Sequence, residues 1–141
     1  MRTRMLGALS AAAALATGCG STDSYDNASR PAAPVNVAVS ITPDGVRVSP
    51  DGIGAGPVVL LVSNQSRTSR DLTLTGAAGD NAGCVTADAS SGPINPDGVA
   101  RLQVDLVEGA CDVGVDDGGL APARLTVGPP RASAQDELLQ P

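Results

Sequence analysis

The sequence contains no histidine, lysine, tryptophan or phenylalanine, and its single tyrosine is Tyr25. Histidine is the commonest general base at neutral pH and a frequent transition-metal ligand, so its absence excludes Ser-His-Asp and Cys-His catalysis. The absence of lysine excludes a Ser-Lys pair in the same way. With one aromatic residue, the chain offers no platform on which nucleic-acid bases would stack. These absences remove the common enzyme classes and leave chemistry carried by carboxylates alone.

Carboxylates are plentiful in the chain, which has 15 acidic and 9 basic residues and a net charge of −6. The aspartates mostly fall in contexts where turns are expected, as in the three Pro-Asp-Gly triplets. The two glutamates, Glu108 and Glu137, stand in an expected turn and in the C-terminal tail. We therefore predict that the protein is not an enzyme, and a carboxylate-dependent hydrolase is the last of three functional hypotheses. The acidic charge also argues against nucleic acid as a partner.

The N-terminal segment has the composition of an export signal. Arg2 and Arg4 precede an apolar run from Met5 to Ala16, and small residues then lead to Cys19. A charged start, a short apolar stretch and a small-residue exit are typical of a segment that directs export. The apolar run is well short of the roughly 20 residues that a membrane-spanning helix needs. We therefore expect removal of residues 1–18.

The stretch Leu15-Ala16-Thr17-Gly18-Cys19 resembles the lipobox of bacterial lipoproteins. In that family the cysteine thiol receives a diacylglyceryl group, and the signal is cut just before the cysteine. The resemblance implies lipidation of Cys19 and a protein held at the extracytoplasmic side of the cell membrane by acyl chains such as palmitate. The alternative is a plain secretory signal followed by a coincidental cysteine.

Beyond the signal, a tether and a strand-rich domain follow. Residues 19–34 are mostly small and polar with interspersed proline, which is typical of a flexible, here lipidated, tether. From 35 to 128, apolar residues alternate with polar or small ones in short runs, as half-buried strands do. The continuous run "PVVLLV" at 57–62 is expected at a sheet centre or buried on both faces. Three tight turns separate such runs, at Pro43-Asp44-Gly45, Pro50-Asp51-Gly52 and Pro96-Asp97-Gly98.

The number of runs predicts the fold class. Seven or eight short strands in residues 35–128 indicate an all-β protein, an antiparallel sandwich with Greek-key connections. Its core must be aliphatic, because large aromatic side chains are absent. In the tail, residues 129–141, Pro129-Pro130 is expected to end the last strand. Beyond it, "SAQDELL" predicts a short helix capped by Ser133, with its two leucines docked on the sandwich or on a partner.

Two segments carry a resemblance to the cupredoxin-like fold. They are "DGVRVSPDGIGAGPVVLLVSNQS", Asp44 to Ser66, and "INPDGVARLQVDLVEGACDVGV", Ile94 to Val115. Copper-binding members of that family use two histidines, a cysteine and usually a methionine. In this sequence Cys111 falls at the family's tyrosine position, and Val115 stands where the copper cysteine would be. The resemblance therefore implies the fold without the copper chemistry, and we expect neither a metal nor another cofactor.

Cys84 and Cys111 are the two cysteines left for the exported domain. In an oxidising envelope we expect them to form a disulfide, and reactive or metal-binding thiols are the alternative. The aspartates at 112, 116 and 117 lie near two glycines and are interpreted as turn residues. A calcium site is the alternative there, although the spaced ligands of a recognised calcium loop are missing.

Three functional hypotheses follow from these features. The first is an envelope lipoprotein, anchored through Cys19, whose cupredoxin-like sandwich is a non-catalytic binding or structural module with a protein partner in the envelope. The second is an accessory protein of a metal-transport or electron-transfer system that has lost its own copper site. The hydrolase comes last.

Overall fold

The computed structural model describes residues 31–77, 83–116 and 119–133. Within these ranges the chain forms strands and connections, and none of it forms a helix long and apolar enough to cross a membrane. The described strands number eight: β1 Val35–Thr42, β2 Gly45–Ser49, β3 Gly52–Asn64, β4 Arg70–Gly76, β5 Ala89–Ile94, β6 Val99–Leu106, β7 Gly109–Val115 and β8 Ala123–Pro130.

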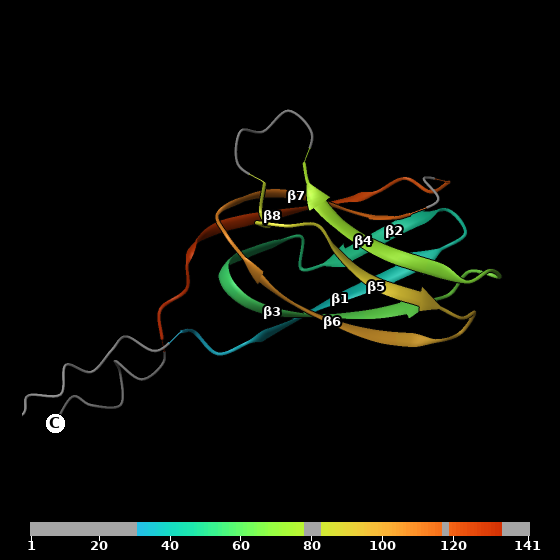
Figure 1. The fold of residues 1–141 in the computed structure, drawn as a ribbon, viewed down its shortest axis with the longest axis horizontal. Helices are drawn as coiled ribbons and strands as arrows, with labels where there is room; N and C mark the ends of the chain where they lie inside the picture. Colours follow the sequence, from blue (N-terminus) through green and yellow to red (C-terminus); the bar gives the residue numbers. More distant parts are fainter. Residues whose placement is uncertain (1–30, 78–82, 117–118, 134–141) are drawn as a thin grey trace, which may run out of the picture.

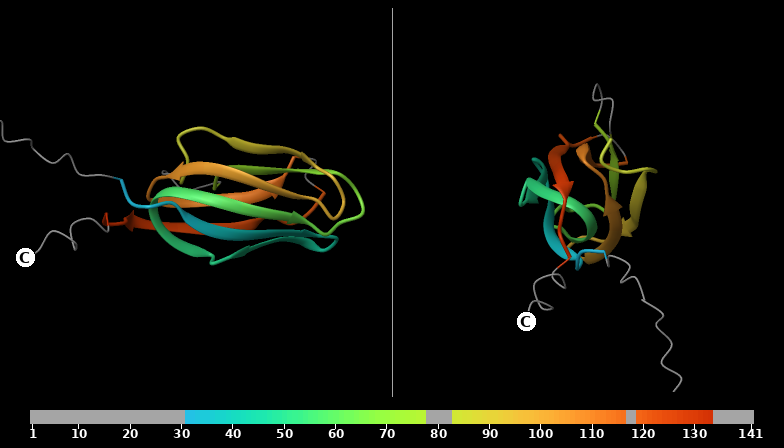
Figure 2. Two further views of the ribbon diagram at one scale, coloured as in Figure 1. Left: turned by 90° about the horizontal axis from the view of Figure 1, so that it is seen from below. Right: turned by 90° about the vertical axis from the view of Figure 1, so that its left-hand side faces the viewer.

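The strands form two layers packed face to face (Figures 1 and 2). In the first layer β1 lies between β2 and β3, and β3 pairs along its other edge with β6. The second layer runs β3-β8-β7-β4-β5. The predicted all-β sandwich is confirmed. The expectation of purely antiparallel pairing is wrong, because β1 with β3 and β3 with β8 pair in parallel.

The mixed pairing arises because β3 bends and belongs to both layers (Figure 1). Residues Gly52 to Ala55 pair with β8, and residues from Gly56 onward pair with β6 or β1. At the corner Gly56 has a φ of +125°, a backbone conformation that glycine adopts without a steric penalty. Pro57 follows it, and a missing N–H is tolerated at an irregular point of a strand.

The core lies between the layers and is aliphatic, as the composition predicts. Along β1 and the second half of β3, alternate residues are fully or almost fully buried and their neighbours are not. The run at 57–62 therefore lies at a sheet centre, as predicted, but buries one face completely rather than both. The largest fully buried aliphatic side chains are Ile41, Leu60, Leu72, Leu74, Leu125, Val37, Val58, Val62 and Val113.

The last strand is longer than predicted. The sequence places its end before Pro129, yet β8 continues to Pro130, which pairs with Ala55 of β3. Its pairing with β7 stops at Val127, so one edge of β8 is free beyond that point. Proline is tolerated on a strand edge that needs no N–H donor. The predicted stop is therefore wrong by two residues.

Candidate functional site

Three connections lie together at one end of the sandwich, and residues 31–34 and 131–133 lie at the other end (Figure 1). The β1–β2 turn, the β3–β4 loop and the β5–β6 turn make up what we call the loop end. Backbone hydrogen bonds join these connections, including Gln65 N–H to the Ile41 carbonyl at 2.8 Å. β7 also ends here, at Val115, where the resemblance to cupredoxins places the copper cysteine.

Asn64 organises the loop end. It is the last residue of β3 and is fully buried. Its side-chain amide donates to the carbonyl oxygens of Thr68 and Ile94, both at 2.8 Å. Its Oδ1 accepts the backbone N–H of Ser66 at 3.0 Å and lies 2.7 Å from the Ser66 hydroxyl oxygen. Two donors and two acceptor positions are the full capacity of an amide side chain, so Asn64 ties the β3–β4 loop to β5.

The backbone of Asn64 also holds the β5–β6 turn. Asn64 N–H donates to the Gly98 carbonyl at 2.9 Å, and Asp97 N–H donates to the Asn64 carbonyl at 2.8 Å. The sequence predicts that glycine takes the positive φ in this turn, but Asp97 takes it, at +60°. Gly98 is needed for space, because a Cβ there would lie 2.7 Å from the Asn95 carbonyl oxygen. Asn64 therefore fixes two of the connections at once.

The fixed loop borders a hollow that carries positive charge. The hollow has a volume of about 420 Å³ and is lined by Pro43, Ser66, Arg67, Thr68 and Arg70. Arg67 and Thr68 are exposed, and Arg70 is half-buried at the start of β4. A guanidinium presents several N–H donors in a planar fork that fits a carboxylate or a phosphate. This arrangement suits an anionic group on a partner.

The copper position of the family does not fit copper in this chain. Val115 stands at the end of β7, and it is buried with an apolar side chain. A type 1 site requires a thiolate and two imidazoles, and the sequence has no histidine. The chemistry of the available donors therefore disagrees with the group that the fold family implies.

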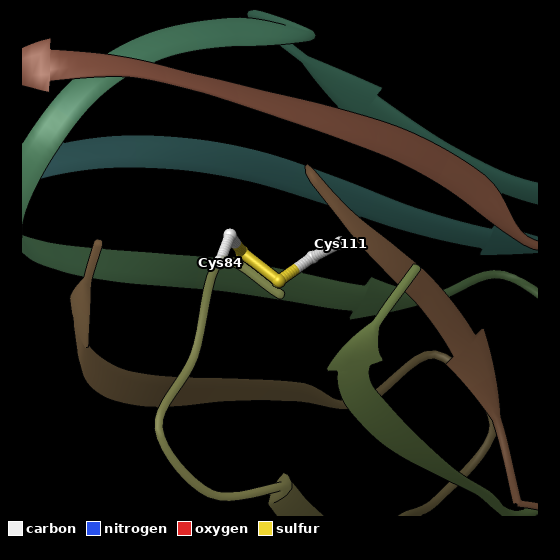
Figure 3. Close-up of a disulfide and its surroundings, with 2 residues drawn as sticks. All are labelled: Cys84 and Cys111. Carbon is white, nitrogen blue, oxygen red and sulfur yellow. A yellow bond between two sulfur atoms is a disulfide. The ribbon is translucent and has the colours of Figure 1, made fainter. Parts of the chain in front are cut away.

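The predicted disulfide is confirmed. Cys84 and Cys111 are joined, with their Cα atoms 5.2 Å apart, and both are fully buried in the core (Figure 3). Backbone bonds hold the same segment, since Cys84 N–H donates to the Ala110 carbonyl and Val107 N–H donates to the Cys84 carbonyl. The disulfide therefore fastens the β4–β5 connection to β7 and leaves neither sulfur as a free thiol.

Other predicted sites lie partly or wholly outside the described residues. Cys19, Asp117 and the predicted tail helix beyond Ser133 fall outside them. Asp112 lies on β7 opposite Arg124 of β8, and Asp116 is exposed after the end of β7. In the described part of the chain, no group of three or more His, Cys, Asp or Glu side chains is placed to hold a metal ion.

Sequence reasoning missed Arg131, which fastens the opposite end of the sandwich. Its guanidinium donates to three carbonyl oxygens: Gly54 at 3.1 Å, Ala33 at 2.9 Å and Pro57 at 2.6 Å. A Cβ at Gly54 would lie 2.6 Å from Arg131 Cγ, so the corner of β3 needs glycine there. The glycines of "GIGAGP" are the available sequence signal, but they do not reveal which side chain packs on them.

No protein-family model matches the sequence, and no curated protein matches it. Among solved structures, auracyanin A of Chloroflexus aurantiacus, described as a "blue" copper protein, is similar with 14% identity and a TM-score of 0.50, covering 68% of this chain and 100% of that chain. A dithionite-reduced auracyanin of Roseiflexus castenholzii has 10% identity and a TM-score of 0.49, covering 71% of this chain and 100% of that one. At the identity of the first, the likeness shows the cupredoxin-like fold alone.

Proposed function

We propose that the protein is a lipid-anchored envelope protein whose cupredoxin-like sandwich serves as a non-catalytic binding or structural module. The observation that carries this proposal is the state of the copper position. A buried valine, Val115, stands where the family has its copper cysteine, and the two cysteines of the sandwich are bonded to each other. What remains is a rigid scaffold with an organised loop end.

The loop end is the proposed binding surface. Its hollow presents the exposed Arg67 in a chain whose net charge is −6, and Asn64 holds the adjoining backbone in place. A surface that is already ordered loses little conformational entropy when a partner binds. The proposed partner is an envelope protein that presents a carboxylate or another anionic group to Arg67.

The anchor is tested by Cys19→Ala. We expect this variant to move from the membrane fraction to the soluble envelope fraction or the medium, because the acyl chains are lost with the thiol. Fractionation of membranes followed by immunoblotting measures the shift. If the wild type and the variant fractionate alike, the lipid anchor is wrong.

The binding surface is tested by photo-crosslinking in native membranes, with mass spectrometry of the adducts. A photoreactive residue replaces Thr68 at the loop end in one variant, and replaces Thr126, exposed on β8, in the matched control. We expect a protein adduct at position 68 that is absent at position 126 and is weakened by Arg67→Ala. The same adducts at both positions, or none at position 68, would contradict the proposal.

A second candidate function is an accessory role in a metal-transport or electron-transfer system. The fold likeness to auracyanin A, described as a "blue" copper protein, favours it. Identification of the adduct as an oxidase or metal-transporter subunit would favour this role over a purely structural one.

A further inference from the structure

β6 forms an open edge of the first layer. Among the described strands it pairs with β3 alone, and Figure 1 shows it along the lower border of the molecule. The outer edge of such a strand presents N–H and C=O groups on which another strand can pair. The exposed large hydrophobic side chains of the described chain lie at the two ends of this strand: Val99, its first residue, is 80% exposed, and Val107, which follows its last residue, is 41% exposed.

The core is also incomplete along β6. On β3, the inward side chains of Val58, Leu60 and Val62 are at most 2% exposed. Their direct partners on β6, Val104, Leu102 and Ala100, are only half-buried. The apolar side chains of β6 therefore pack against the core and remain partly accessible.

The outward positions along β6 are complementary to those of a second copy that runs in the opposite direction. At alternate positions from 99 to 107 the chain has valine, arginine, glutamine, aspartate and valine; Val107 follows the last residue of β6, and its N–H already donates to the Cys84 carbonyl, so only its side chain is available to a partner strand. If a second copy of β6 runs antiparallel with Gln103 at the centre, each Arg101 faces Asp105 of the other copy. Each Val99 then faces Val107 of the other copy. On the inward face the same register sets Leu102 opposite Val104, which covers these partly accessible apolar side chains.

We propose that two copies of this chain associate through their β6 strands in this register, around a twofold axis that passes between the two Gln103 residues. The first layers of the two sandwiches then form one continuous sheet. A twofold contact of this kind uses the same surface on both copies. Both open β6 edges are then paired with each other, so no further chain can add to them. This inference is independent of the proposed anchor and of the loop-end partner.

The register is specific. A shift by two residues sets Val99 opposite Asp105 in one direction, and Arg101 opposite Val107 in the other. Both shifts replace an opposite-charge pair and an apolar pair with mismatches, and each matched pair contributes to strand association. A shift by one residue would turn the apolar face of one copy to the wrong side of the sheet. The charges of Arg101 and Asp105 also cancel within each strand. The two acidic chains therefore meet through strands that carry no net charge.

The first test is cross-linking of full-length chains carrying Gln103→Cys. Residues directly opposite in an antiparallel pair have Cα atoms about 4.5–5.5 Å apart, within the range of roughly 4.4–6.8 Å that a disulfide spans. We expect a disulfide-linked dimer on non-reducing gels after mild oxidation of cells that produce the variant. The matched control is Asn36→Cys, equally exposed on β1 but away from the edge. Cross-linking at position 103 no greater than at position 36 would overturn the proposal.

The second test exchanges the charges in the Gln103→Cys background. Arg101→Asp alone sets aspartate opposite aspartate twice, and we expect cross-linking to fall by about tenfold or more. Arg101→Asp combined with Asp105→Arg restores opposite charges in every pair, and cross-linking is expected to return. Both side chains are exposed, so an unchanged melting temperature shows that the fold is kept. Equal cross-linking in the single and the double variant would overturn the register.

Discussion

At each end of this sandwich, one side chain holds several backbone segments together. Asn64 ends the strand run "PVVLLVSN", and its amide fixes the loop end through bonds to Thr68, Ile94 and Ser66. The alternation of apolar residues along this strand does not indicate which groups the asparagine side chain bonds. Arg131 holds the other end together. The sequence does not predict this role, because the acceptors of Arg131 are backbone carbonyls 74 to 98 residues away. Every residue has a backbone carbonyl, so the residue types do not show which carbonyls accept these bonds.

At this scale the prediction is that Asn64→Ala lowers the free energy of unfolding by about 3 kcal/mol, because buried carbonyl and N–H groups lose their partners. Urea denaturation followed by circular dichroism measures the loss. The matched control is Gln65→Ala, an exposed neighbour with a single long side-chain bond to Ser63, and it should cost about 0.5 kcal/mol or less. Equal losses in the two variants would show that the Asn64 network does not hold the loop end.

At the scale of elements, alternation predicts the strands that bury one face and misses β5, in which Ile94 is the one buried residue. The disulfide is also predictable, since few cysteines remain to pair. Pairing partners are harder, because the parallel contacts of β3 with β1 and β8 depend on its corner at Gly54 to Pro57. The alternation of buried residues shifts at this corner, because two partly buried residues, Gly56 and Pro57, separate Ala55 from Val58. The run "GIGAGP" marks an irregularity and does not say that the strand changes layers.

The prediction at the scale of elements concerns the corner of β3. Arg131→Ala should lower the free energy of unfolding by about 2 kcal/mol, because three carbonyl acceptors lose a charged donor. The matched control is Arg47→Ala, an exposed arginine of β2, for which a change within about 0.5 kcal/mol is expected. Thermal unfolding of both variants provides the comparison. A neutral Arg131→Ala would mean that the glycine corner and the parallel pairing stand without this side chain.

At the scale of the whole molecule, a cupredoxin-like fold is kept while the donor set of a copper site is replaced. Val115, at the position where the sequence resemblance places the copper cysteine, is buried, and Cys111 forms a disulfide in the core. The fold class is predictable from strand spacing and from the two resembling segments. The partner is not, because recognition depends on surface side chains such as Arg67 whose spacing carries no periodic signal. The proposed scaffold role therefore requires that the sandwich does not bind copper as a type 1 site.

Copper loading of the purified Cys19→Ala protein tests that central claim most directly, because this variant has no cysteine outside the disulfide. We predict no intense thiolate-to-copper absorption and the same melting temperature with and without Cu(II). Loose binding of Cu(II) to surface carboxylates would change neither measurement. A blue stoichiometric complex would contradict the account. At a hundredfold excess over its dissociation constant, a bound ion adds about 2.7 kcal/mol of stability, which raises the melting temperature of a domain of about 100 residues by roughly 10 °C or more.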